Sequence, residues 1–297
     1  MPKRRALALI VDSAASLPVD AASHDLMHVV PMRLMMGGKS RRDGEDVSSA
    51  DFYRHLRTAK ELPTTSAPSP SSFLSAIRSA ADDAAAILCM TVSPRFSSTF
   101  EAASSAVDTA RGELPGTDFG VMDTRSAAGG EGLVVTSALR ALVSGHGLHE
   151  TMAVAKEVVG RVSLLAYLDT LHYLWKGGRV RRLAHAGTAL LNIKPLFELR
   201  QGDVKGIAHP RSRRRALDRL VQLTHERAPV GLLHAAVMHA DDPEGAERLR
   251  LRLVAEFDCA ELYTSEFSPV MGVHTGPGLV GVAFWSEGPP ISPDRRT

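Results

Sequence analysis

A hydroxyl-rich turn is the first part of this chain whose residue types and spacing could do chemistry. It follows an apolar run of strand length at residues 86–92, and it contains Ser97 and Ser98. Ser98 and Glu101 have the spacing of a capping box, so we expect a helix to begin at Ser98. The free backbone N–H groups at the start of such a helix can bind an anion without a lysine or arginine. The alternative is that the two serines only cap the helix.

Two further strand ends carry the same kind of polar turn. An apolar run at residues 6–11 leads into Asp-Ser-Ala-Ala-Ser at 12–16, and a run at 118–122 leads into Asp123 and Thr124. The carboxyl ends of parallel strands share one edge of a sheet, which is where ligands bind in α/β proteins. The pattern therefore predicts that these turns lie together at a ligand site.

Two other candidate residues stand in stretches that favour loops. Thr65 belongs to the stretch 62–72, whose three prolines exclude regular structure. A hydroxyl that only forms a turn is the alternative to a ligand at this position. His274 stands among glycines, which let the backbone approach a ligand closely, and a loop histidine with a structural hydrogen bond is the alternative. Gly177 and Gly178 are typical of the end of a helix.

The composition excludes several classes of protein. Thirty-five basic and 33 acidic residues leave a net charge of +2, too balanced to indicate nucleic acid or a membrane surface as partner. Cys89 and Cys259 stand in apolar stretches that favour buried thiols, and no Cys/His cluster indicates a zinc or other metal site. The N-terminal apolar run is only six residues long and ends at Asp12, which favours a first strand over a signal peptide. No apolar stretch is long enough to span a membrane, so we expect a cytoplasmic protein.

The order of the expected elements predicts an α/β fold with two domains. Strands and helices alternate in residues 1–160, which predicts a mostly parallel sheet, with a small excursion at about 30–60. In that excursion a single strand is expected at residues 29–36. Residues 161–285 have a mixed pattern that predicts an α+β domain, and residues 286–297 are expected to form a mobile tail.

Seven stretches of the chain resemble, in order, the sequence blocks of the DegV family. They are VDSAASLP (11–18), TTSAPSP (64–70), SPRFSSTFEAA (93–103), VMDTRSAAGGEG (121–132), LDTLHYLWKGGRV (168–180), LLNIKPLF (190–197) and SPVMGVHTGPGLVGVAF (268–284). The resemblance implies a two-domain DegV-like fold whose interdomain cleft holds one long-chain fatty acid. Proteins of this family present the fatty acid to a separate fatty acid kinase, which makes an acyl phosphate for phospholipid synthesis. The resemblance therefore implies a lipid-binding carrier without a cofactor, not an enzyme.

The resemblance also implies which residues hold the head group. Thr65, Ser97 and His274 match the positions that bind the carboxylate in the family. Arg179 matches the arginine of the Gly-Gly-Arg block, and it is expected with Ser98 in the head-group network.

The resemblance also marks one residue for docking the kinase and two positions at which this sequence differs from the family pattern. Arg211 matches a basic position that is expected to dock the kinase. Ser98 replaces a family glycine, which narrows the expected approach of the head group, and Ala67 replaces a glutamine, which removes a polar neighbour. An apolar slot must hold the acyl chain. Its candidate residues are Leu34, Phe73, Leu190, Ile193, Leu196 and Phe284, for which a place in the hydrophobic core is the alternative.

Three other classes of function fit only parts of the sequence. A Ser/His lipid or ester hydrolase would use Ser97 and His274, but Ser97 lacks a G-x-S-x-G elbow and no acid partner for the histidine stands out. A nucleotide-binding enzyme is not favoured, because the sequence has no G-x-x-x-x-G-K-[ST] and no G-x-G-x-x-G that follows a strand. The basic run at 211–219 has no interleaved aromatic residues, so no nucleic acid partner is expected, and membrane contact is expected to be transient at most.

Overall fold

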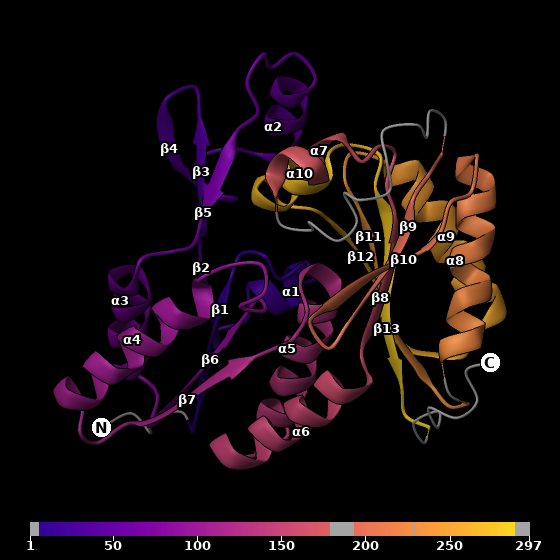
Figure 1. Ribbon diagram of the computed structural model, residues 1–297. Coiled ribbons are helices and arrows are strands. Elements are labelled where there is room, and N and C mark those ends of the chain that lie inside the picture. The colour runs from indigo at the N-terminus through magenta and orange to yellow at the C-terminus, as the bar shows by residue number, and fades with distance from the viewer. Residues whose placement is uncertain (1–5, 179–192, 229, 289–297) are drawn as a thin grey trace.

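The computed structural model describes residues 6–178, 193–228 and 230–288 of the chain. The first half is built on a parallel sheet with the strand order β2-β1-β6-β7 (Figure 1). Its strands are β1 (Ala8–Asp12), β2 (Met27–Val30), β6 (Ala86–Thr91) and β7 (Asp118–Asp123). All three pairings are parallel, so the predicted sharing of one edge by the ends of β1, β6 and β7 is confirmed.

Helices bury both faces of this sheet. On one face lie α3 (Pro70–Ala81) and α4 (Thr99–Glu113), and on the other lie α5 (Ala128–Val143) and α6 (Leu148–Arg161). Ile10 of β1 packs with α3 and α4, whereas Leu9 and Val11 belong to the core on the opposite face. Because both faces of the sheet are buried, its central strands consist of continuous apolar runs in the sequence.

The second half is built on a mixed sheet with the strand order β10-β9-β8-β13-β11-β12. Its strands are β8 (Ser163–Tyr167), β9 (Leu196–Arg200), β10 (Asp203–Ala208), β11 (Leu233–His239), β12 (Cys259–Glu266) and β13 (Val280–Ser286). Only β11 and β12 pair in parallel. The predicted α/β class, with one parallel sheet and one mixed sheet, is therefore confirmed.

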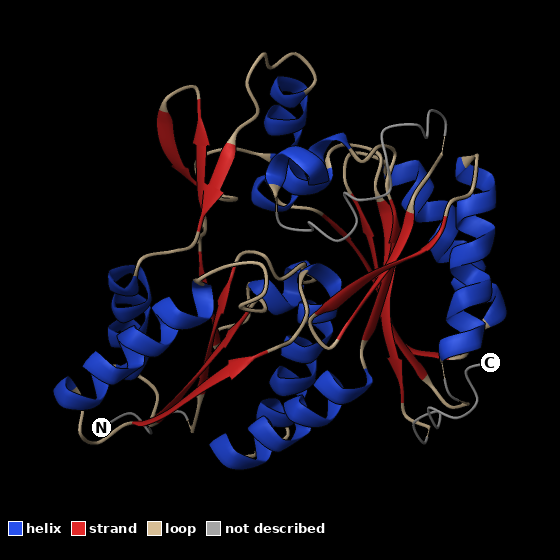
Figure 2. Cartoon of the chain, in the orientation of Figure 1, coloured by secondary structure: helices blue, strands red, loops and turns tan. Residues whose placement is uncertain are grey.

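Helices α8 (Arg213–Arg227) and α9 (Pro243–Glu256) cover the outer face of the mixed sheet (Figure 2). Its inner face packs on α5, where the backbone N–H of Gly129 lies 3.0 Å from Met238 Sδ on β11. A Cβ on Gly129 would lie 2.7 Å from the same sulfur, so glycine lets this helix approach the strand. Helix α5 is thus a layer that both sheets share. The division of the chain near residue 160 stays a prediction.

A small antiparallel sheet with the order β4-β3-β5 stands beside the parallel sheet (Figure 1). Its strands are β3 (Arg33–Met36), β4 (Lys39–Arg42) and β5 (Thr64–Ser66). Gly37 and Gly38 form the β3–β4 turn with φ of 58° and 75°, values that favour glycine. The short helices are α1 (Val19–Ala22), α2 (Ser49–Leu56), α7 (His172–Gly177) and α10 (Pro269–Thr275).

Several local predictions were wrong, each for a physical reason. The expected strand at 29–36 is divided at Pro31, which cannot donate to a strand ladder, so β2 and β3 join different sheets. The proline-rich stretch contains β5, a three-residue strand that pairs with β3. Ser98 does stand at the N-cap of α4, but its ψ of 21° differs from the extended backbone of a capping residue, and its side chain makes no capping bond.

One of the two thiols and the expected tail also differ in detail from the predictions. Cys89 is buried, which raises the pKa of its thiol to about 12, whereas Cys259 is only partly buried. Strand β13 extends to Ser286, so ordered structure reaches the first residue of the expected tail. Residues 289–297 lie outside the described part of the chain.

Candidate functional site

A cavity lies between the carboxyl edge of the parallel sheet and the inner face of the mixed sheet. It contains about 930 Å³ of empty space, a volume that includes open solvent at its mouth. Strand β8 lines it with Leu164 and Ala166, and β9 lines it with Phe197 and Leu199. These are alternate residues of their strands, so their side chains share one face of the sheet. The wall they form is apolar.

None of the described candidates for an acyl slot lines this cavity. Leu34, Phe73, Leu196 and Phe284 are buried in hydrophobic cores, Ile193 is not among the lining residues, and Leu190 lies outside the described residues. Apolar runs identify a buried strand but do not tell which of its faces opens into a cavity. Leu196 faces the core under α8 and α9, whereas its neighbour Phe197 faces the cavity. The strand alternation at 197 and 199 was the signal that could have found the lining.

Thr65 and His274 meet at the polar part of the cavity. Thr65 Oγ1 and His274 Nε2 lie 2.8 Å apart in a hydrogen bond, although 209 residues separate them in the chain. Thr65 is placed by β5, where it pairs with Leu34 of β3. His274 lies on α10 rather than in the loop that the alternative interpretation assumed, and its side chain does make a hydrogen bond within the protein. Pro269 at the first position of α10 favours the start of a helix, and Gly276, with φ of 70°, ends it.

The histidine ring packs directly against a glycine of α7. A Cβ built on Gly177 would lie 2.7 Å from His274 Nδ1, closer than real side-chain carbons come. Gly178 ends α7 in the left-handed conformation with φ of 67°, as the C-cap prediction required. The two glycines therefore have separate structural roles. Gly177 makes room for the imidazole, and Gly178 turns the chain.

Ser97 lines the same cavity from the loop after β6. Its Oγ lies 2.7 Å from Thr99 Oγ1, which is buried at the first position of α4. The structure thus brings Thr65, Ser97 and His274 to one cavity, as the resemblance implied. Ser98 is exposed at the N-cap and is not among the lining residues.

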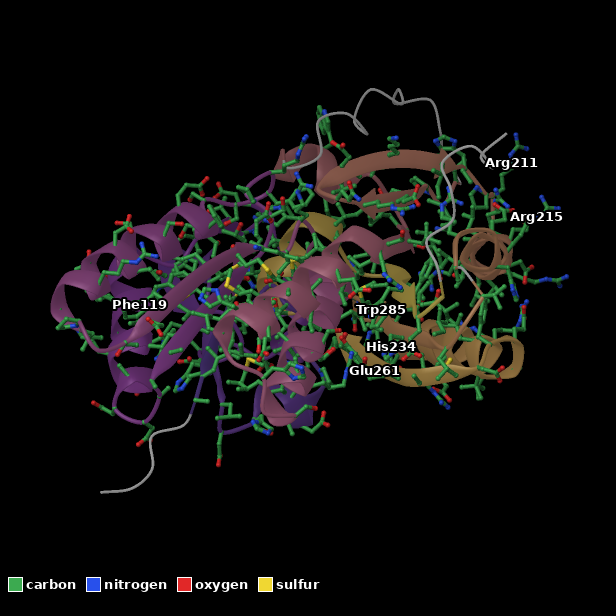
Figure 3. All side chains as sticks on the ribbon, turned by 90° about the horizontal axis from the view of Figure 1, so that it is seen from below. Phe119, Arg211, Arg215, His234, Glu261 and Trp285 are labelled. Atoms are coloured by element: carbon green, nitrogen blue, oxygen red, sulfur yellow. The ribbon has the colours of Figure 1, made fainter. Side chains whose placement is uncertain are left out.

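The two arginines that the resemblance marks are not among the described residues that line the cavity. Arg179 lies outside the described residues. Arg211 is exposed just before α8, on the side of the molecule opposite Phe119 of the parallel sheet (Figure 3). It does not line the cavity.

No charged side chain is among the described residues that line the cavity. Its polarity comes from hydroxyl groups, one imidazole and the N-termini of two helices, since Ser97 precedes α4 and Ala127 caps α5. Helix N-termini carry partial positive charge and free N–H groups. Such a set can hold a carboxylate by neutral hydrogen bonds. Ala128, at the start of α5, has a φ of 50°, a strained conformation that the sequence did not reveal.

A buried carboxylate shapes the strand-end turns beneath this site. Asp12 Oδ1 accepts the N–H of Ala14, and Oδ2 accepts the N–H of Val92, both at 2.9 Å. Ala14 and Val92 line the cavity, so Asp12 fixes two parts of its wall. Burial raises the pKa of Asp12 to about 6, against the lowering effect of the two N–H groups. The polar turns predicted from the sequence therefore include a structural acid.

The described residues were also compared with the requirements of a metal site and of a membrane-spanning helix. No group of three or more His, Cys, Asp or Glu side chains in this part of the chain is arranged to hold a metal ion. None of the helices in the described ranges combines the length and the apolar character that crossing a membrane requires.

Comparison with known proteins places these features in a family context. The family model described as "Uncharacterised protein, DegV family" matches residues 6–287. A DegV domain-containing protein of Streptomyces coelicolor is 31% identical over 285 residues, covering 95% of this chain and 99% of the relative. The solved structure described as fatty acid binding of a DegV family protein from Thermus thermophilus has a TM-score of 0.86 at 28% identity, covering 94% of this chain and 99% of that one. A Thermotoga maritima structure, described as revealing fatty acid binding function, has a TM-score of 0.82 at 25% identity, covering 95% and 99%.

Proposed function

This chain belongs to the DegV family, and from that premise we propose that it binds one long-chain fatty acid and presents the carboxylate to a separate fatty acid kinase. The acyl chain lies in the apolar cavity between the two sheets. Thr65, Ser97 and His274 bind the carboxylate. The kinase then forms an acyl phosphate for phospholipid synthesis, and this chain supplies no chemical step of its own.

One observation carries the proposal. A cavity with a mostly apolar lining has, among its lining residues, a hydroxyl–imidazole pair and three further hydroxyl residues, contributed by three separate parts of the chain. A fatty acid has the same distribution of properties, with a long apolar tail and one small polar head. The absence of charged side chains from the described lining suits a ligand that must be handed over, because an arginine pair holds a carboxylate more tightly than neutral donors do.

The expected binding free energies differ between the apolar cavity and the polar residues of the site. Burying about ten methylene groups at ~0.8 kcal/mol each contributes roughly 8 kcal/mol. That alone corresponds to a dissociation constant of about 1 μM before the cost of association is subtracted. A neutral hydrogen bond adds only about 0.5–1.5 kcal/mol. The tail therefore supplies most of the affinity, and the polar residues select the carboxylate and orient it.

Three further residues have parts in this proposal. Arg179 and Ser98 belong to the head-group network; Arg179 lies outside the described residues, and Ser98 is exposed at the N-cap of α4 and would act from the rim of the cavity. Arg211 docks the kinase from the exposed start of α8. Arg213, two residues later, is engaged with Asp169 Oδ1 at 3.0 Å, so it is less suited to docking.

The hydrogen bonds favour the carrier over the Ser/His hydrolase. His274 Nε2 bonds with Thr65 Oγ1, and Ser97 Oγ bonds with Thr99 Oγ1. A hydrolase of the expected kind needs its base bonded to the serine nucleophile. In our proposal the two hydroxyls act instead as separate ligands for a finished carboxylate.

Lipid extraction from the purified protein tests the proposal. We expect about one fatty acid per chain by mass spectrometry. Val204→Trp, on the cavity side of edge strand β10, should reduce this amount, whereas Lys205→Trp, on the exposed neighbouring residue, should not. A protein that contains no fatty acid, takes up none when palmitate is supplied and hydrolyses esters would support the hydrolase instead.

A further inference from the structure

Asp43 is a buried carboxylate in a segment that the sequence marks as exposed. It follows β4 in the charged run from Lys39 to Asp46, yet only 3% of its surface is accessible. Its Oδ2 accepts the hydroxyl proton of Ser13 at 2.6 Å, and its Oδ1 accepts the backbone N–H of Val270 at 3.0 Å. One side chain thus joins the turn after β1 to the first turn of α10.

The bonds around Asp43 also fix the start of β3. The backbone N–H of Asp43 donates to the carbonyl of Met32 at 3.0 Å. The N–H of Met32 donates to Ser13 Oγ, also at 3.0 Å. Met32 immediately precedes β3, and β3 carries β5 with Thr65 through the pairing of Leu34 with Thr65. Asp43 and Ser13 therefore hold the strand pair that places Thr65.

The same carboxylate holds the helix that places His274. Val270 is at the second position of α10, where a backbone N–H has no partner within the helix. Asp43 supplies the acceptor for that N–H, and His274 follows one turn later on the same helix. The contacts form a closed circuit from Asp43 through α10 to His274, across the 2.8 Å bond to Thr65, and back through β5 and β3.

We propose that Asp43 is a positioning residue for the carboxylate site, setting the distance between Thr65 and His274 without touching the ligand. This inference rests on the proposed function. For comparison, the hydroxyl of Tyr53 donates to the carbonyl of Phe267, which precedes the N-cap of α10, at 3.3 Å. Asp43 differs because it bonds to the supports of both ligand residues. A carboxylate with two separate acceptor oxygens is suited to that task, since each oxygen serves one support.

Selectivity between two ligands with the same tail separates this role from general stability. Palmitate and hexadecanol would share the apolar cavity, and they differ at the head group. Their affinities can be measured by displacement of a fluorescent fatty acid from the full chain. In Asp43→Ala we expect the preference for palmitate over hexadecanol to fall roughly two- to tenfold, the value of one head-group hydrogen bond, with hexadecanol affinity little changed. Asp46→Ala is the matched control, because Asp46 belongs to the same turn but pairs with Arg42 at the surface.

A spectroscopic measurement reads the position of the histidine directly. The Nε2 resonance of His274, assigned with His274→Gln, should shift in Asp43→Asn and remain in place in Asp46→Asn. Asp43→Asn is the milder variant if Asp43→Ala fails to fold. Its amide oxygen can still accept the N–H of Val270, whereas its NH₂ group replaces the oxygen that accepted the Ser13 hydroxyl. Equal weakening of palmitate and hexadecanol, together with an unmoved His274 resonance, would overturn the inference. If the wild-type chain shows no preference for palmitate while the resonance still shifts, the proposed function fails and the positioning role of Asp43 stands.

Discussion

Gly177→Ala is the perturbation that most specifically disturbs the proposed head-group site. The added Cβ would lie 2.7 Å from His274 Nδ1, about 0.8 Å short of an ordinary contact of ~3.5 Å. The imidazole must therefore shift or rotate, and its 2.8 Å bond with Thr65 changes geometry. Losing one neutral hydrogen bond to the ligand site costs about 0.5–1.5 kcal/mol, so we expect fatty acid affinity to fall roughly two- to tenfold.

We expect Gly177→Ala to weaken binding although alanine favours the helix more than glycine does. A loss of helix stability therefore cannot explain the weaker binding. Gly177 is in α7, and alanine in a helix is intrinsically more favourable than glycine by up to about 1 kcal/mol. Gly112→Ala is the matched control, because it is in α4 with nothing within 4 Å of the added carbon. Titration with palmitate should show weaker binding for Gly177→Ala and unchanged binding for Gly112→Ala. Wild-type affinity in Gly177→Ala would refute the placement of His274 in the head-group site.

The remaining predictions concern the hydroxyls, the kinase surface and a buried acid. Ser97→Ala and Thr65→Ala should each weaken fatty acid binding by about 0.5–1.5 kcal/mol, and a double variant that binds palmitate like wild type would contradict the assignment. Charge reversal at Arg211 and Arg214 should leave fatty acid binding intact and slow acyl-phosphate formation by the kinase, since exposed charges mainly set association rates; equal loss of binding would assign these residues to the pocket. Burial and neighbouring acids raise the pKa of Glu131 well above 4.5, so its contribution to stability is present below pH 4.5 and is lost as pH rises through the folded-state pKa. Glu131→Met should therefore unfold at a higher temperature than wild type, by a margin that widens as pH rises from 4.5 to 8, and a margin independent of pH would show that this carboxyl does not titrate as described.

Local pattern predicted the parallel half of the fold and one wall of the site. The apolar run at 86–92 and the hydroxyl turn after it form β6 and the Ser97 loop, because a strand buried on both faces has a sequence signature of its own. The shared edge of β1, β6 and β7 followed from their parallel pairing. These features depend on residues that are close together in the chain.

Features that depend on distant contacts were not predictable in this way. Helix α10 has only seven residues, and Gly272 within it packs closely on Phe52 and Tyr53 of α2. A helix of that length is stabilised mainly by such packing, so its position could not be predicted from the periodicity of its own residues. The role of Asp43 was not predictable either, because an acid in a charged turn is expected to be exposed to solvent. Its partners, Ser13 and Val270, are distant in the sequence.

The most direct test of the central claim is the ¹³C spectrum of palmitate labelled at its carboxyl carbon. Bound to the wild-type chain at one equivalent, the label should give a single resonance distinct from that of free palmitate. Thr65→Ala and His274→Ala should each move this resonance, while Lys205→Ala, on the exposed side of β10, should leave it in place. A bound resonance that none of these variants moves would contradict the account, because the carboxylate would then lie away from Thr65 and His274.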